Sequence, residues 1–302
     1  MAARDFRVES IEYATGLAEL RMVRETVFVH EQRVPPEEEW DALDPLCRHV
    51  IARDESGLPI GTGRLTPERR IGRMAVLAEW RGQGVGEAML AALMVEARKQ
   101  GWPAVSLNAQ VSAEAFYARQ GFIPEGERFM EAGIEHQSMR RALAGPTVVE
   151  NLAGAIAATT AVVTQARRQL RIYSRELDPG LLDNAAVLAA LRRFSTGNPG
   201  GEIRILLQDA ATPQHALAPL LGLAQRLPSV FAFREVREPV DKAYASAFVA
   251  NDARGYYFRT LGHRFDGETD LDGAGRARQL REEFGRFWER ARPCTEFRAL
   301  GI

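Results

Sequence analysis

The sequence predicts an α/β protein with two folded domains, and three observations support this fold class. Its 302 residues approach the upper size of a single hydrophobic core, so two domains are expected. In the first half, an apolar run leads through a glycine-rich turn into a helical pattern. In the second half, strand and helix patterns alternate, which is typical of a sheet covered by helices.

The glycine-rich turn is Arg81-Gly82-Gln83-Gly84-Val85-Gly86, which follows a strand expected over 71–76. Apolar residues then recur every three or four positions from Glu87 to Gln100, and Gly101 provides a stop, so a helix follows the turn. Unpaired N–H groups at the start of a helix suit a phosphate or diphosphate. Because the pattern is neither a Walker loop nor a dinucleotide fingerprint, a tight turn that binds nothing is an equally good interpretation.

The residues downstream of this helix favour the binding interpretation. A strand is expected over 104–110, and a short helix with Phe116 and Tyr117 follows it. Gly121 ends that helix, and a further strand begins at Phe122-Ile123. The glycine turn is therefore one part of a longer ordered pattern.

Over about residues 6–143, the chain resembles the GNAT superfamily of acyl-CoA-dependent N-acyltransferases. The match consists of the Arg-x-x-Gly-x-Gly turn between strand and helix, Asn108 on the next strand, and the run from Ala115 to Phe122. The run from Arg24 to Gln32 and the acidic run Glu37-Glu38-Glu39-Trp40-Asp41 resemble a bacterial branch of this superfamily.

The resemblance implies that residues 1–145 form a GNAT domain: a mixed, mostly antiparallel central sheet flanked by helices, with strands splayed at the CoA site. It also implies an N-acetyltransferase with acetyl-CoA as co-substrate, in which a primary amine attacks the thioester directly and a tetrahedral intermediate forms. Backbone groups on the strand before the turn would hold the donor and face the developing oxyanion. The residues expected to bind the co-substrate are Met74, Ala75, Val76, Arg81, Gly82, Gln83, Gly84, Val85, Gly86, Asn108 and Phe116.

Tyr117 is the expected proton donor to the departing thiolate, since GNATs commonly place a tyrosine near the sulfur. As an alternative, Tyr117 is a core aromatic beside Phe116.

The candidate bases are Glu31, which lies in the Glu-Gln pair of the N-terminal run, and His49 and His136, because imidazole titrates near neutral pH. Ordered water could also accept the proton, in which case no dedicated base exists.

Two further features each have two interpretations. Asn108 either contacts the pantetheine arm or satisfies the end of its own strand. The acidic run over 37–41 either attracts a cationic acceptor or forms a solvated face, and the solvated face is favoured because charge runs are usually exposed.

The second domain is expected over 146–302, since Gly145-Pro146 ends the first pattern. It weakly resembles a half-module of the phospholipase D superfamily, but Tyr244 and Ser246 stand where that superfamily needs His and Lys, so phosphodiesterase chemistry is not expected. A regulatory or accessory role is expected instead. The expected helices lie around 148–168, 181–195, 214–226 and 275–291, and the expected strands at 170–173, 203–208, 230–235, 244–250 and 255–259.

Composition restricts the partners. The formal net charge is −1, so nucleic acid is not an expected partner. Cys47 and Cys294 have no metal-ligand spacing, and no metal is expected. No secretory segment follows the polar start and the apolar stretch 148–166 is too interrupted to span a bilayer, so a cytoplasmic bacterial protein without a membrane partner is expected.

The expected acceptor is a small-molecule or peptide amine, and a homodimer is compatible with the second domain. An alternative function of a different class is a CoA-responsive binding or sensor protein, in which a non-catalytic phospholipase D-like module recognises an anionic ligand. The intact glycines and Tyr117 favour the enzyme.

Overall fold

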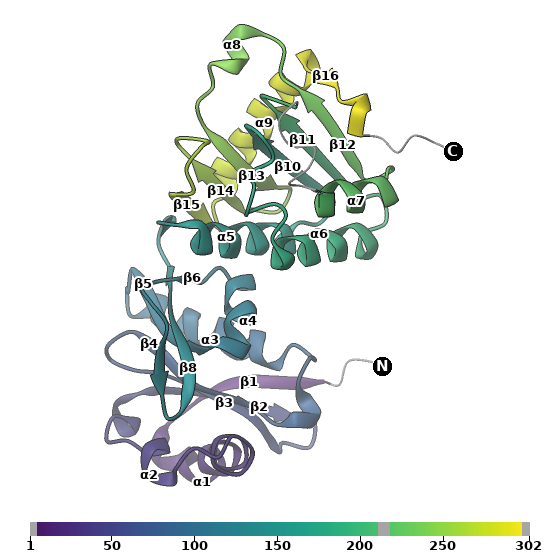
Figure 1. Cartoon of the computed structure of the whole chain (residues 1–302). Coiled ribbons are helices and arrows are strands. Elements are labelled where there is room, and N and C mark those ends of the chain that lie inside the picture. The colour runs from purple at the N-terminus through teal and green to yellow at the C-terminus, as the bar shows by residue number, and fades with distance from the viewer. Residues whose placement is uncertain (1–4, 211–217, 298–302) are drawn as a thin grey trace. The chain divides into compact units, whose positions relative to one another are not determined.

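The computed structural model describes residues 5–210 and 218–297 (Figure 1). The chain forms two compact units. The first comprises residues up to Ala113 together with Glu125–Ala144, and the second comprises Glu114–Pro124 together with residues from Gly145 onward. The segment that carries Tyr117 therefore groups with the second unit, and a simple domain boundary near 145 stays a prediction.

The first unit is built on a sheet with strand order β1-β2-β3-β4-β5-β8, to which β7 adds by pairing with β8. β4 and β5 run parallel, whereas the other pairs among these strands are antiparallel. The predicted mixed, mostly antiparallel sheet is confirmed. The strands are β1 (Phe6–Ile11), β2 (Arg48–Asp54), β3 (Pro59–Leu65), β4 (Arg70–Val76), β5 (Ala104–Gln110), β7 (Phe129–Glu131) and β8 (Ile134–Ala142).

Helices cover both faces of this sheet, with α1 (Tyr13–Arg24) and α3 (Val85–Lys99) on opposite sides (Figure 1). The stripe predicted from the sequence faces inward on α3, where Met89, Leu90, Leu93, Met94 and Ala97 are buried. A π-helical turn (Glu25–Glu31) continues α1, and α2 (Pro36–Glu39) follows. Short 3₁₀ turns occur at Asp44–Leu46, Ala78–Trp80 and Val111–Ala113.

The second unit contains a sheet with strand order β16-β12-β11-β10-β13-β14-β15-β9. β10, β11 and β12 are parallel, and the remaining pairs are antiparallel. The strands are β9 (Thr147–Val149), β10 (Gln169–Ser174), β11 (Glu202–Leu207), β12 (Phe231–Glu235), β13 (Ala247–Asn251), β14 (Tyr256–Arg259), β15 (Gly267–Asp270) and β16 (Arg292–Pro293). The predicted α/β architecture of this half is confirmed.

Two long helices cover opposite faces of this second sheet. Phe248 of β13 packs edge-to-face on Phe284 of α9, whereas the Asn251 amide donates to the Val162 carbonyl of α5. Because residues three apart on a strand point to opposite faces, α9 and α5 lie on opposite sides. The helices of this unit are α4 (Glu114–Arg119), α5 (Leu152–Gln165), α6 (Ala185–Gly197), α7 (Ala218–Arg226), α8 (Pro239–Lys242) and α9 (Ala274–Arg290); the unit also holds β6 (Ile123–Pro124) and a 3₁₀ turn at Thr295–Phe297.

Most predicted elements are present, and the errors lie in short or terminal segments. The strand predicted over 104–110 has the observed bounds of β5. The helix predicted from 148 begins only at Leu152, because residues 147–149 form β9 and the Asn151 side chain caps α5 by accepting from the Gly154 N–H. The predicted start of α7 at 214–217 lies outside the described residues.

Candidate functional site

The two central strands of the first sheet separate near the glycine turn. β4 pairs with β5 only at Arg70↔Ser106 and Ile71↔Leu107. On its other side β4 stays paired with β3 as far as Val76. Along the described part of this edge, Met74, Ala75 and Val76 therefore have no β5 partner. These three residues were predicted to present their backbone to the donor.

A β-bulge shapes this edge. The register of β3 with β4 shifts between Thr62 and Arg64, and Arg73 on β4 has a positive φ of 50°. A bulge places one extra residue in a strand and locally increases its twist, often beside an active site. The backbone strain at Arg73 is consistent with a site that the surrounding contacts hold in place.

The glycine turn joins β4 to α3 with left-handed backbone at two positions. Gly82 has φ 74° and Gly84 has φ 89°, and a Cβ added at either glycine would meet nothing within 4 Å. The turn thus needs glycine for its backbone conformation rather than for space. α3 begins at Val85 and includes Gly86, while the Gln83 side chain donates to the Glu79 carbonyl at 2.8 Å. The N–H groups of the first α3 turn are available to an anion.

Arg81, predicted to lie beside the diphosphate, forms a bidentate ion pair with Glu31. Its two terminal nitrogens lie 2.6 Å from the two carboxylate oxygens, and its Nε donates to the Val76 carbonyl at 2.9 Å. The hydrogen bond from Arg81 lowers the pKa of Glu31. A carboxylate whose charged form is stabilised is a weaker base, so this geometry favours a positioning role for Glu31.

Polar side chains of β5 and β8 form hydrogen bonds on one face of the first sheet. Asn108 accepts from the Ser138 hydroxyl at 3.1 Å, and Gln110 lies opposite His136 in the β5–β8 register. Gln110 also donates to the Gln32 side-chain oxygen at 2.8 Å, which connects β5 to the loop after the π-helical turn. Sequence reasoning did not single out Gln32 or Gln110. The sequence held only a weak indication of these two residues. Gln110 lies two positions after Asn108 and so shares its strand face, and Gln32 directly follows Glu31.

His136 is held in an orientation compatible with a base. Its Nδ1 lies 2.9 Å from the Ile134 carbonyl, and its ring stacks on Phe129 at 5.9 Å between centroids. Because a carbonyl only accepts, Nδ1 carries the proton and Nε2 keeps a lone pair in the neutral ring; this tautomer is assigned from the hydrogen bond. His49 and His136 are both buried, at 2% and 9% exposure. The difference is that the Nε2 of His49 lies 2.8 Å from the Asp44 carbonyl, with its ring against Tyr13.

Tyr117 and Phe116 lie on α4 and belong to the second unit. Tyr117 packs edge-to-face against Phe116 at 4.9 Å and against Phe122 at 6.0 Å. Burial raises the pKa of Tyr117 to about 12. The phenol therefore stays protonated at neutral pH, as a proton donor requires.

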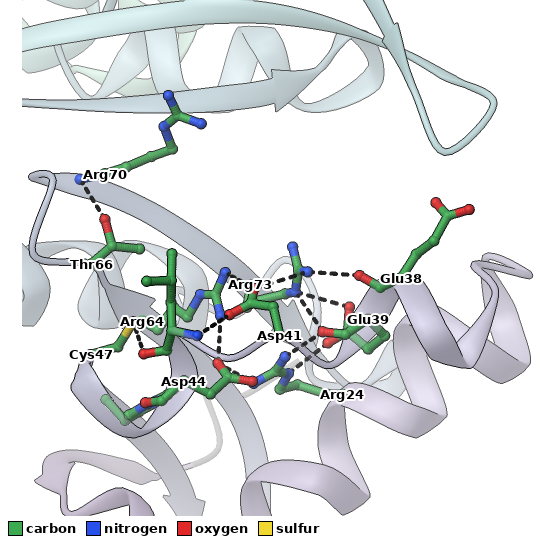
Figure 2. Close-up of polar contacts among 12 residues, drawn as sticks. Arg24, Glu38, Glu39, Asp41, Asp44, Cys47, Arg64, Thr66, Arg70 and Arg73 are labelled. Atoms are coloured by element: carbon green, nitrogen blue, oxygen red, sulfur yellow. Dashed lines mark hydrogen bonds and ion pairs between the residues drawn. The ribbon is translucent and has the colours of Figure 1, made fainter.

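The acidic run is only partly the solvated face that the sequence favoured. Figure 2 shows Glu39 and its neighbours inside a network with three arginines. Arg24 contacts Glu39 at 2.6 Å and Asp44 at 3.0 Å, while Arg73 contacts Glu39 at 3.0 Å. Glu37 and Glu38 remain exposed. The prediction was wrong for Glu39 because the arginines that bury it lie 15 and 34 positions away.

Burial and charge oppose each other in this arginine–carboxylate network. Burial raises the pKa of Glu39, and the attraction of Arg24 and Arg73 offsets only part of this effect. Burial also pushes the pKa of Asp44 upward, but Arg24 and Arg64 together outweigh it and hold that pKa below its usual value. Arg73 also donates to the Glu38 and Glu39 carbonyls, so the network holds the bulge of β4.

Within 5–210 and 218–297, no group of three His, Cys, Asp or Glu side chains is placed to hold a metal ion. Among the helices of those same ranges, none combines the length and apolar character needed to cross a bilayer.

Comparisons with known proteins separate the two halves of the chain. Residues 19–143 match the acetyltransferase (GNAT) domain family, and residues 151–300 match a domain of unknown function (DUF7931). The uncharacterized N-acetyltransferase YjcF of Bacillus subtilis is 39% identical over 123 residues, which cover 39% of this chain and 87% of that protein. The phospholipase D-like interpretation of the second half stays a prediction.

Among solved structures, an acyl-CoA N-acyltransferase from Pseudomonas aeruginosa is 30% identical, with a TM-score of 0.42, and covers 46% of this chain and 100% of that one. Escherichia coli ElaA is 27% identical, with a TM-score of 0.40, and covers 45% of this chain and 99% of that one. The family match and the identity to YjcF carry the assignment. Through residues 19–143 the chain belongs to the GNAT family of acetyltransferases, which supports an acyl-CoA-dependent N-acyltransferase function.

Proposed function

We propose that this protein transfers an acetyl group from acetyl-CoA to a primary amine by direct attack on the thioester. The observation that carries the proposal is the separation of β4 from β5 directly before the glycine turn. Met74, Ala75 and Val76 have no β5 partner, so this edge of β4 is open to the pantetheine arm, although the Val76 carbonyl accepts from Arg81. The residues Gly82, Gln83, Gly84, Val85 and Gly86 offer N–H groups and the positive end of α3 to the diphosphate.

The reaction forms one C–N bond and breaks one C–S bond. The neutral amine attacks the thioester carbonyl, and a backbone N–H of β4 stabilises the oxyanion of the tetrahedral intermediate. His136 accepts the amine proton through Nε2, either directly or through water. Tyr117 donates its proton to the departing thiolate and is reprotonated from solvent. Glu31 holds Arg81 against the end of β4 and thereby positions the donor site.

We also propose the organisation into domains. Residues 1–145 form the acetyltransferase domain, with Asn108 and Phe116 near the pantetheine arm. Residues 146–302 form an accessory or regulatory domain, which could act in dimer formation or acceptor delivery. The acceptor belongs to the class of small-molecule or peptide amines.

Calorimetric titration with acetyl-CoA, followed by a free-thiol release assay over a panel of amines, tests the function. Saturable binding and thiol release with at least one amine are expected. Tight binding without turnover on any amine would support a CoA-responsive sensor instead. Absence of binding would remove both functions, because each needs the donor site.

Replacing Tyr117 by phenylalanine is expected to lower kcat by about tenfold, with little change in acetyl-CoA affinity, because the lost proton transfer occurs late in the reaction. Since the pKa of Tyr117 is raised to about 12, its ionisation should not reduce wild-type turnover below about pH 10. Steady-state kinetics as a function of pH measure both effects. Equal kcat in the variant would exclude Tyr117 from the mechanism.

His136→Gln and Glu31→Gln distinguish His136 from Glu31 as the base. His136→Gln is expected to lower kcat several-fold, with water partly replacing the lost proton acceptor. Glu31→Gln should mainly raise the KM for acetyl-CoA, because it frees Arg81 from its bidentate pair. The reverse pattern, with kcat lost only in Glu31→Gln, would make Glu31 the base.

A further inference from the structure

The second unit contains a cavity of about 150 Å³ at one edge of its sheet. Arg175 directly follows β10 and Arg259 ends β14. Because β13 is antiparallel to both strands, the ends of β10 and β14 meet at the same edge. The loop after β14 completes the lining with Gly262, His263 and Phe265. No residue of the acetyltransferase site takes part.

The walls of this cavity are held by specific contacts. Leu177 and Asp178 have positive φ values of 67° and 48°, a strained conformation for non-glycine residues that persists only where the surrounding contacts hold it. The Gly262 N–H donates to the Ala245 carbonyl at 2.7 Å, and a Cβ at Gly262 would lie 3.1 Å from Arg175. The Tyr257 hydroxyl donates to the Phe265 carbonyl. The cavity therefore has an ordered rim.

The lining offers more hydrogen-bond donors than its acidic residues use. Arg259 is only 2% exposed; it pairs with the Asp178 carboxylate and donates to the Arg264 carbonyl, but its buried Nε has no partner among the described residues. This guanidinium is therefore part of the wall of the cavity, and the donors that a ligand can reach lie elsewhere in the lining. Asp178 is already neutralised by Arg259.

Two more donors lie at the rim. Within the described ranges, Arg175 makes no ion pair and the His263 ring makes no hydrogen bond, and both residues are exposed. Glu176, also exposed, is the remaining acidic residue of the lining. With the Arg259–Asp178 pair neutral, Arg175 and Glu176 balance each other in charge. The excess is therefore in donors at the rim: the Arg175 guanidinium and the His263 imidazole.

We propose that this cavity binds a phosphate group, either as the free ion or as the end of a phosphomonoester. Its volume exceeds the ~30 Å³ of one water but lies below the ~300 Å³ at which pockets for drug-sized ligands begin, so a single small group fits. A guanidinium group matches the geometry of phosphate oxygens, and the donors of Arg175 and His263, which lie on two separate loops, suit a tetrahedral anion. This site is independent of the proposed acetyl transfer.

Titration of the full-length protein with inorganic phosphate tests the proposal, with sodium chloride at matched ionic strength and acetate as a planar anion. Phosphate should give a saturable calorimetric signal and raise the Tm by about 2–4 °C, whereas chloride and acetate should not. No saturable signal would overturn the proposal. An equal response to acetate would overturn the assignment to phosphate.

Three substitutions localise the binding. Arg175→Gln and His263→Gln should each weaken phosphate binding by about tenfold without changing the Tm measured in the absence of phosphate, because neither exposed side chain supports the fold. Arg264→Gln is the matched control: this exposed arginine pairs with Asp266 and contributes only its carbonyl to Arg259. Wild-type affinity in both test variants, or equal loss in the control, would contradict the assignment.

The glycine-turn variant Gly84→Asp separates the two sites. It should retain phosphate binding in the second unit while losing acetyl-CoA binding. Loss of phosphate binding in Gly84→Asp would instead place the bound phosphate at the turn, and the cavity proposal would fail.

Discussion

Replacing Gly84 by aspartate is expected to weaken acetyl-CoA binding by more than about 100-fold. Gly84 has φ 89°, so any side chain strains the backbone there. An aspartate also adds a negative charge where the diphosphate is proposed to lie. At about 4 Å and an effective dielectric constant near 20, two like charges repel by about 4 kcal/mol, which exceeds the change needed for a 100-fold loss.

Gly84→Ala separates strain from charge, since a Cβ at this position would meet nothing within 4 Å. The alanine variant should lose affinity by only about tenfold or less. Calorimetric Kd values for the wild type and both variants measure the difference, and thermal unfolding checks that each is folded. Equal affinity in the alanine and aspartate variants would mean that no phosphate lies near the turn.

Replacing Arg24 by methionine is expected to destabilise the protein by about 3–5 kcal/mol, the usual cost of removing one partner from a buried ion pair. Arg24 is 1% exposed, and its loss leaves Glu39 and Asp44 buried without their shared cation. The free energy of unfolding from denaturant titration measures this effect. Arg21→Met is the matched control, because Arg21 is exposed on the same helix and its guanidinium carbon also lies over the Trp40 ring, at 5.1 Å; it should cost about 1 kcal/mol or less.

The pH dependence of the Arg24→Met loss provides a second test. Burial already raises the pKa of Glu39, and removing Arg24 should raise it further. A carboxyl group whose pKa is raised in the folded state destabilises the fold increasingly as the pH rises from its unfolded-state pKa, and fully above its folded-state pKa. The effect disappears at low pH, where both states are protonated. The destabilisation should therefore be larger at about pH 8 than at about pH 5. A loss that does not change with pH would show that the charge of Glu39 is not responsible.

Adding Glu39→Gln to Arg24→Met should recover part of the lost stability, because the amide needs no counter-charge. If the double variant is less stable than Arg24→Met alone, the network stabilises by packing rather than by charge. The Trp40 ring, 4.6 Å from the Arg24 guanidinium carbon, is the contact that would then dominate.

The sequence alone predicted the features that depend on residues close together along the chain. The glycine turn, the buried stripe of α3 and the bounds of β5 follow from backbone conformation and from apolar periodicity, both of which are local. The GNAT assignment rests on such segments in their order along the chain, and the family match bears it out.

Only the tertiary structure revealed features that join distant segments. Glu39 lies in an exposed-looking acidic run, yet Arg24 and Arg73 from other elements bury it. Gln32 meets Gln110 across 78 positions, and the short strands β9, β15 and β16 have too few residues to show a periodicity. The cavity between the ends of β10 and β14 likewise depends on strand order. Pairing and burial of this kind are set by contacts between segments far apart in the chain, which no local pattern encodes.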